Sequence, residues 1–153
     1  MSKTDETLLL AELIAKKHEC LCRLDEIGAR QMVLIEEGNI AGLLDLLAFK
    51  QQFLVRIQQI EQALKPFQQQ DPADRVWPDE ELRRTTAARL DECKTLLGRI
   101  IERERLGEQT LARRRDEIAA TLENVRNVQA AQGAYRAQEE EPSIVSRFDA
   151  SCE

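Results

Sequence analysis

Apolar residues recur three and four positions apart along most of the chain, the spacing typical of one face of an α-helix. The first apolar stripe runs from Leu10 to Leu34 and is interrupted only by Lys17 and Gln31. Its other members are Leu13, Cys20, Leu24 and Ile27. Acidic residues in a first helical turn complement the unpaired N–H groups, and Asp5 and Glu6 occupy that position here. The pattern predicts a helix over about residues 5–37.

The stripe changes phase at Gly38–Asn39. Its original register would continue onto Gly38, Ala41 and Asp45, which make a poor apolar seam. A new register beginning at Ile40 gives a better one: Ile40, Leu43, Leu47, Lys50, Leu54, Ile57, Glu61 and Leu64. Glycine is a favoured C-cap and asparagine a favoured N-cap, so a break or sharp kink is expected there. The second predicted helix covers about residues 39–65 and ends at Pro66, because the residue before a proline avoids the helical region.

Residues 66–78 hold three of the four prolines and are predicted to form a linker. No proline follows between residues 79 and 131, which predicts one long third helix of about 80 Å. Its stripe is Leu90, Cys93, Leu97, Ile100, Glu104, Gly107, Leu111, Arg114, Ile118, Thr121, Val125 and Val128. The pattern fails after Ala131. Residues 132–153 contain Gly133, Pro142 and three consecutive glutamates, so a flexible, disordered C-terminal tail is expected.

A helix with a one-sided apolar stripe requires a partner to cover it. The sequence therefore predicts an elongated all-α fold, with residues 1–131 forming one antiparallel helical bundle. Two arrangements satisfy the pattern: a hairpin in which the long helix folds back along the two N-terminal helices laid end to end, or a three-helix coiled-coil bundle. Polar residues at the seam positions Lys17, Gln31 and Lys50 favour one specific register of pairing.

The composition of the chain limits the classes of function that are expected. Charged residues make up 33% of the chain, aromatic residues only 4%, and the net charge of −6 argues against a nucleic-acid partner. The cluster Arg113–Arg115 is followed directly by Asp116 and Glu117, so it is interpreted as a solvated helix face. The first residues show no charged segment followed by an apolar run, so no signal peptide is expected, and no stretch of about 18 apolar residues occurs in the sequence. A cytoplasmic protein without stable membrane insertion is expected, with its four cysteines reduced.

Catalytic groups are scarce. His18 and Cys22 lie four residues apart on one helix face, but two ligands do not make a metal site. Cys93 lies on the third seam and is interpreted as a small buried residue. We therefore expect no enzyme activity, no metal and no cofactor. A redox or metal-dependent protein built on the cysteines is the alternative, which a measurement of metal content would test.

The segment Leu34–Ile40, followed by leucines at 43, 44, 47 and 54 and by Lys50, resembles the FlgN family of flagellar export chaperones. In that family a first helix ends in a short break rich in Gly, Asp or Asn, and a leucine-rich helix with a lysine follows. A linker and one long C-terminal helix come next, and a tyrosine opens a mobile tail; here it corresponds to Tyr135. The resemblance covers about residues 8–135. Of the family's mid-helix asparagine–glycine pattern, only Gly107 is present.

The resemblance implies a cytosolic chaperone that binds hook–filament junction subunits and delivers them to the cytosolic domain of the export gate. The later half of the long helix offers an apolar stripe for the client: Leu111, Ile118, Leu122, Val125 and Val128. Tyr135 would dock onto the gate, with added contacts from Ile144, Val145 and Phe148.

Three alternatives stay open. In the first, the client-binding stripe residues are part of the core. In the second, the C-terminal tail is a frayed end without a partner. In the third, the chain is a structural coiled-coil scaffold that self-associates, for example as a homodimer. A chaperone binds its client with defined stoichiometry, whereas a scaffold shows only self-association.

Overall fold

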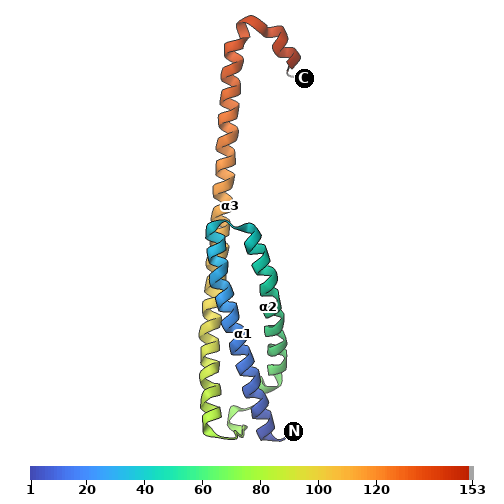
Figure 1. Cartoon of the computed structure of the whole chain (residues 1–153), viewed down its shortest axis with the longest axis vertical. Helices are drawn as coiled ribbons and strands as arrows, with labels where there is room; N and C mark the ends of the chain where they lie inside the picture. The colour runs from blue at the N-terminus through green and yellow to red at the C-terminus, as the bar shows by residue number, and fades with distance from the viewer. Residues whose placement is uncertain (152–153) are drawn as a thin grey trace. The chain divides into compact units, whose positions relative to one another are not determined.

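The structure is a computed structural model that describes the backbone of residues 1–151 and the side chains of residues 1–138. It contains helix α1 (Lys3–Glu37), helix α2 (Ile40–Gln68), a short 3-10 helix η1 (Pro72–Asp74) and helix α3 (Glu80–Ser151), as Figure 1 shows. Residues 1–151 include no strand, so the predicted all-α class is confirmed. The chain divides into two compact units, Met1–Thr110 and Leu111–Glu153.

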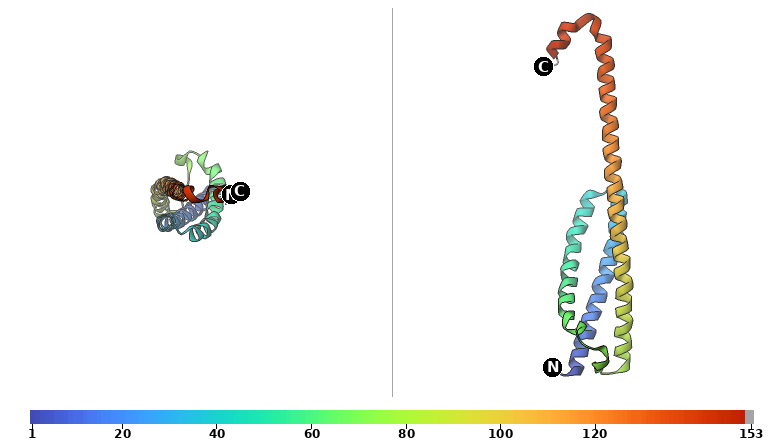
Figure 2. Two further views of the ribbon diagram at one scale, coloured as in Figure 1. Left: turned by 90° about the horizontal axis from the view of Figure 1, so that it is seen from above. Right: turned by 180° about the vertical axis from the view of Figure 1, so that it is seen from behind.

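The first unit is a three-helix bundle made of α1, α2 and residues 80–110 of α3. Helix α2 runs antiparallel to α1, and the first part of α3 runs parallel to α1 (Figures 1 and 2). Polar contacts between α1 and α3 join residues whose numbers increase together along the two helices. His18 Nε2 lies 2.6 Å from the Glu92 carboxylate, and Asp25 pairs with Arg99 (3.2 Å). The two N-terminal helices therefore lie side by side as a hairpin, and they are not laid end to end along the third.

The reversal between α1 and α2 has a local cause. Gly38 adopts the left-handed conformation (φ 68°, ψ 24°), and its N–H donates to the Ile35 carbonyl. The Asn39 N–H donates to the Leu34 carbonyl (3.0 Å), which satisfies a second carbonyl at the end of α1. The Asn39 side chain then accepts from the Gly42 N–H (2.9 Å) and caps α2. The predicted break is confirmed, and this pair of caps turns the chain back on itself.

Two helix starts differ slightly from expectation. Helix α1 begins at Lys3, because Ser2 forms a capping box with Asp5: the Asp5 N–H donates to Ser2 Oγ (3.1 Å) and the Ser2 N–H to the Asp5 carboxylate (3.3 Å). Asp79 lies just before α3 and accepts from the Leu82 N–H (2.7 Å). It therefore acts as a cap, and the helix begins one residue later than predicted.

Pro66 does not end α2, which continues to Gln68. A proline removes one hydrogen bond from a helix, a loss that is tolerated near the C-terminal end where carbonyls reach solvent. Phe67 is 7% exposed and packs in the core, so its burial favours one further turn. Arg75 strengthens this turn by donating from Nη2 to the Phe67 carbonyl (2.8 Å).

The linker after α2 is tied to the bundle. Asp71 accepts from the Ala73 N–H (3.0 Å) and starts η1. The Thr7 hydroxyl, buried in α1, donates to the Val76 carbonyl (2.7 Å). Trp77 packs against the main core cluster. These contacts hold the start of α3 beside the N-terminus of α1.

Helix α3 passes the predicted end at residue 131 and remains helical through Gly133 and Tyr135. Alanines around Gly133, at positions 130, 131, 134 and 137, are the strongest helix formers. Together they outweigh the cost of a single glycine, about 1 kcal/mol. The expectation that the tail begins at residue 132 therefore differs from the structure over residues 132–138.

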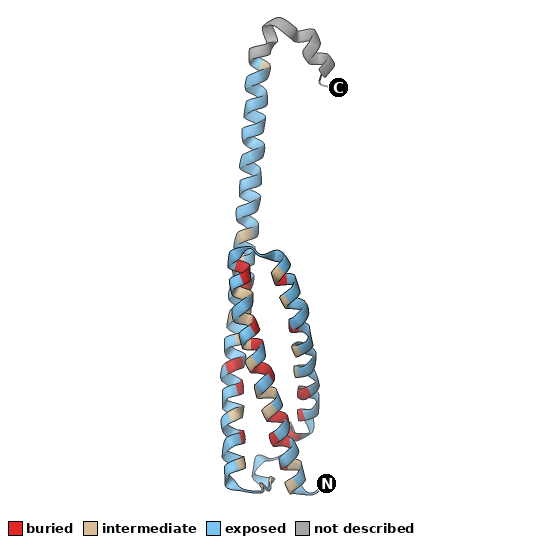
Figure 3. Cartoon of the chain, viewed as in Figure 1, coloured by how far each residue is buried: buried red, intermediate tan, exposed pale blue. Residues whose placement is uncertain are grey.

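The buried core follows the first predicted seam closely and the other two only in part (Figure 3). Leu10, Leu13, Cys20, Leu24, Ile27 and Leu34 of α1 are all buried, as predicted. On α2 the buried residues are Leu43, Lys50, Ile60, Leu64 and Phe67. The seam positions Ile40, Leu47 and Leu54 are instead 57%, 38% and 40% exposed. On α3, Leu96 is buried in place of its neighbour Leu97.

Candidate protein-binding surfaces

The predicted client-binding residues form an exposed apolar stripe on α3, here named the distal stripe. Its members are Leu111, Ile118, Leu122, Val125 and Val128, which are 40%, 62%, 52%, 47% and 55% exposed. Their spacings of seven, four, three and three residues place them on one side of a continuous helix. None of these five residues is buried within the single chain. Figure 3 shows residues of this part of α3 almost uniformly exposed.

Charged side chains flank the distal stripe. Residues 111–138 contain five arginines and three carboxylates, although the whole chain carries a net charge of −6. Arg113 pairs with Glu117 (3.7 Å) and Arg115 with Asp116 (3.6 Å), and all four side chains are well exposed. Such surface pairs contribute little stability. The segment is thus an apolar stripe in a locally basic setting.

Tyr135 lies seven residues after Val128, on the same side of the helix, and its exposed fraction is 63%. A shallow hollow of about 380 Å³ is lined by Val128, Ala131, Gln132, Tyr135 and Arg136. The ring is accessible, as docking requires. The other predicted docking residues, Ile144, Val145 and Phe148, lie outside the residues whose side chains the structure describes.

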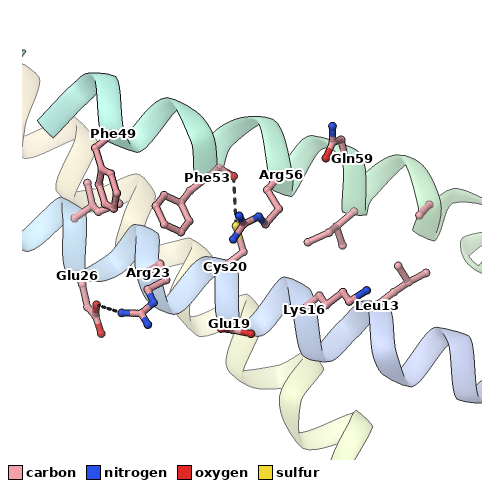
Figure 4. A pocket seen from close by; sticks show the side chains of 13 residues that line it. Leu13, Lys16, Glu19, Cys20, Arg23, Glu26, Phe49, Phe53, Arg56 and Gln59 are labelled. Atoms are coloured by element: carbon pink, nitrogen blue, oxygen red, sulfur yellow. Dashed lines mark hydrogen bonds and ion pairs between the residues drawn. The ribbon is translucent and has the colours of Figure 1, made fainter. Parts of the chain in front are cut away.

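A second surface was not found from the sequence. It is a groove of about 850 Å³ between α1 and α2, here named the α1–α2 groove (Figure 4). Leu13, Cys20, Ile27, Phe53 and Ile60 contribute its apolar lining. The remaining lining residues are Lys16, Glu19, Arg23, Glu26, Phe49, Arg56, Gln59 and Ala63. The groove arises from two helix flanks that meet only in the folded bundle, so no single run of sequence indicates it.

Aromatic side chains organise one wall of the α1–α2 groove. The rings of Phe49 and Phe53 meet edge to face with their centroids 5.2 Å apart. The Arg56 guanidinium lies over the Phe53 ring, 5.4 Å from its centroid. The Cys20 thiol donates to the Phe53 carbonyl (3.3 Å) across the two helices. These contacts fix the two rings and the arginine relative to α1.

The polar seam residues hold the helices in register. Lys50 is 7% exposed, and its ammonium group contacts the Glu104 carboxylate and donates to Gln31 Oε1 (3.2 Å). Lys17 pairs with Glu61 (2.6 Å), which joins α1 to α2. Because these charges face one another across the helix interfaces, they act as structural contacts. None of them is left over to bind a ligand.

The histidine and cysteines do not assemble a metal site among the described residues. His18 Nε2 lies 2.6 Å from the Glu92 carboxylate and 3.9 Å from Cys22 Sγ. No group of three His, Cys, Asp or Glu side chains in the described part of the chain is placed to hold a metal. Cys20, Cys22 and Cys93 are free thiols. Burial raises the pKa of the Cys20 and Cys93 thiols, which keeps them protonated and weakly nucleophilic at neutral pH.

No family model matches the chain, and no curated protein or solved structure is similar to it. The resemblance to the FlgN family therefore rests on the sequence pattern alone. Over the described residues, no helix has both the length and the hydrophobicity needed to cross a bilayer.

Proposed function

We propose that this chain is a binding protein whose distal stripe holds an amphipathic helix of a partner. The exposure of Leu111, Ile118, Leu122, Val125 and Val128 along one helix face carries this proposal. Contiguous exposed apolar surface in a protein typically marks an interaction site. A partner helix with anchors at three-and-four spacing covers such a stripe, and each half-exposed side chain it buries contributes about 1 kcal/mol.

Within this class, the resemblance supports a cytosolic flagellar export chaperone. Its clients are hook–filament junction subunits, and its docking partner is the cytosolic domain of the export gate. The locally basic character of residues 111–138 favours a client helix with acidic flanks, because opposite charges across an interface steer association and suppress wrong partners.

The client-binding test compares two pairs of substitutions in the same helix. Leu122→Asp with Val125→Asp places two charges on the distal stripe and should abolish retention of a purified junction subunit. Ala120→Asp with Asn127→Asp adds the same charge to the opposite face and should leave retention unchanged. Both stripe residues are about half exposed, so circular dichroism should show helicity preserved in both variants. Retention of the subunit by the stripe variant would place the client site elsewhere.

Tyr135 provides a separate test of gate docking. Removing an exposed hot-spot aromatic costs on the order of 2 kcal/mol of binding free energy. Tyr135→Ala should therefore weaken binding to the gate domain while client affinity stays the same. Tyr135→Phe, which keeps the ring, is the matched control. Equal gate binding by wild type and Tyr135→Ala would remove the docking role and leave client binding standing.

A self-associating scaffold is the second candidate, favoured by the heptad-like spacing of the distal stripe. Two copies pairing along this stripe would cover it as a client does. Sedimentation velocity separates the two functions, because a scaffold forms a dimer without a client and loses it in the Leu122→Asp, Val125→Asp variant.

A further inference from the structure

The α1–α2 groove has the dimensions and direction of a helix-binding site. Its lining runs from Leu13 to Ile27 on α1 and from Phe49 to Ala63 on α2, in steps of one, three and four residues that keep to one flank of each helix. A stretch of this length rises by about 21 Å in an α-helix, or four turns. The groove therefore follows the axes of the two helices, as the space for another helix in a bundle does.

The apolar lining of the groove remains partly open. Leu13, Ile27 and Ile60 belong to the buried core, and their outer edges form its floor. Phe49 contacts the Phe53 ring yet is 49% exposed. An exposed phenylalanine above a concave apolar floor is suited to an aliphatic anchor from a partner.

The charged side chains that line the groove indicate the chemistry of its partner. Figure 4 shows Arg56 directed from α2 into the groove, toward Cys20 on α1. Among the described residues no carboxylate forms an ion pair with Arg56, whose guanidinium lies over the Phe53 ring. Lys16 and Arg23 differ, because they pair with Glu12 (3.0 Å) and Glu26 (3.4 Å) along the surface of α1. Arg56 thus lies in the groove against an aromatic ring and, among the described residues, without a carboxylate in ion-pair contact, although Glu19 of α1 also lines the groove.

We propose that the α1–α2 groove binds an amphipathic helix of another protein, with apolar anchors against Phe49 and Phe53 and an acidic residue against Arg56. The bound helix packs on α1 and α2 as a fourth helix of the bundle. A carboxylate facing Arg56 forms a charge-assisted hydrogen bond in a partly desolvated setting, which fixes the register of the partner. This site is made of residues other than the distal stripe and does not depend on the function proposed above.

A second copy of the chain is a poorer occupant. The segment that holds its distal stripe, residues 111–138, carries five arginines against three carboxylates. Placing that segment in the groove would bring more positive charge toward Arg56. Like charges across an interface oppose association. The partner is therefore an acidic helix from a different protein.

A display library of 14-residue helical peptides tests the proposal. Each peptide carries a fixed leucine stripe, and the positions that flank the stripe are randomised. Selection uses the full chain carrying Leu122→Asp and Val125→Asp, so that peptides do not bind to the distal stripe. Enriched peptides should carry aspartate or glutamate beside the central leucines. Their affinity should fall on the order of tenfold or more with Arg56→Glu. It should fall further with Phe49→Asp and stay unchanged with Arg84→Glu, a matched charge reversal on exposed α3.

Two results would overturn the proposal. One is a selection that enriches no peptide, or peptides that bind the Arg56→Glu variant as tightly as the parent. The other is a dimer of the chain, detected by sedimentation velocity, that dissociates on Arg56→Glu, since a second copy would then fill the groove. Circular dichroism of each variant confirms that its helices are intact, because Phe49 and Arg56 are both exposed.

Discussion

The bundle of residues 1–110 and the distal part of α3 carry the same kind of apolar stripe, but only the bundle covers its own. Leu24 in the bundle is 3% exposed, whereas Leu122 in the distal stripe is 52% exposed. Both are leucines on a helix with apolar neighbours three and four residues away. The spacing shows that a face requires a partner, and it does not show whether the partner belongs to the same chain.

The difference also separates two sources of helix stability. Helices in the bundle are held by packing around Leu24 and by interhelical ion pairs such as Lys17–Glu61. Residues 111–138 have almost no buried side chain and rely on residues with high helix propensity. Helices supported in this way are marginal in water and gain stability when a partner covers them.

The largest contrast in stability is expected between alanine substitutions of Leu24 and Leu122. Leu24→Ala should lower the free energy of unfolding by about 2–5 kcal/mol, because it removes buried atoms and leaves a cavity. Leu122→Ala should change it by less than about 0.5 kcal/mol, since the side chain is already half solvated. Urea denaturation followed by circular dichroism measures both. Similar losses in the two variants would show that the distal stripe is covered in solution.

A smaller contrast is expected between a buried and an exposed ion pair. Glu104→Ala leaves the Lys50 ammonium buried with only Gln31 as a partner, and should cost about 2 kcal/mol of stability. Glu117→Ala breaks an exposed pair with Arg113 and should cost less than about 0.5 kcal/mol. Thermal unfolding is the measurement. Lys50→Met, which removes the buried charge itself, should be close to neutral, and a loss as large as that of Glu104→Ala would contradict this account.

The smallest effects are expected from two glycines with opposite roles. Gly38 has φ 68°, so Gly38→Ala strains the turn and should destabilise the bundle by about 1 kcal/mol. Gly133 lies inside α3, and a Cβ there would meet nothing within 4 Å. Gly133→Ala should therefore stabilise the distal helix by up to about 1 kcal/mol. Chemical denaturation reports the first change and helical content the second, and two changes of the same sign would rule out this assignment.

Much of the fold follows from local rules in the sequence. The all-α class, the break at Gly38–Asn39 and the seam of α1 were predicted, because each depends on spacing or capping within one helix. The seam of α2 was only partly predicted. This helix has apolar residues on two flanks, with Leu47 and Leu54 on one and Phe53 and Ile60 on the other, and spacing alone does not choose between them. The partner helices make that choice.

The two candidate surfaces also differ in whether the sequence predicts them. The distal stripe was predicted, since all its residues lie on one helix. The α1–α2 groove was not, because it combines Leu13 and Ile27 with Phe49 and Phe53 from another helix. Trp77 is a similar case: it stands in a linker in the sequence, yet it packs against the core once Thr7 binds the Val76 carbonyl.

The interhelical ion pairs also favour one handedness of the bundle. A three-helix bundle has two mirror-related orders of its helices, and an apolar stripe on each helix satisfies both equally well. Asp25 lies on the flank of α1 that faces α3, where it pairs with Arg99 and Arg103. In the mirror-related order, this carboxylate would face α2 and lose both arginines. The charges on the edges of the stripes therefore favour the observed order of the three helices over its mirror image.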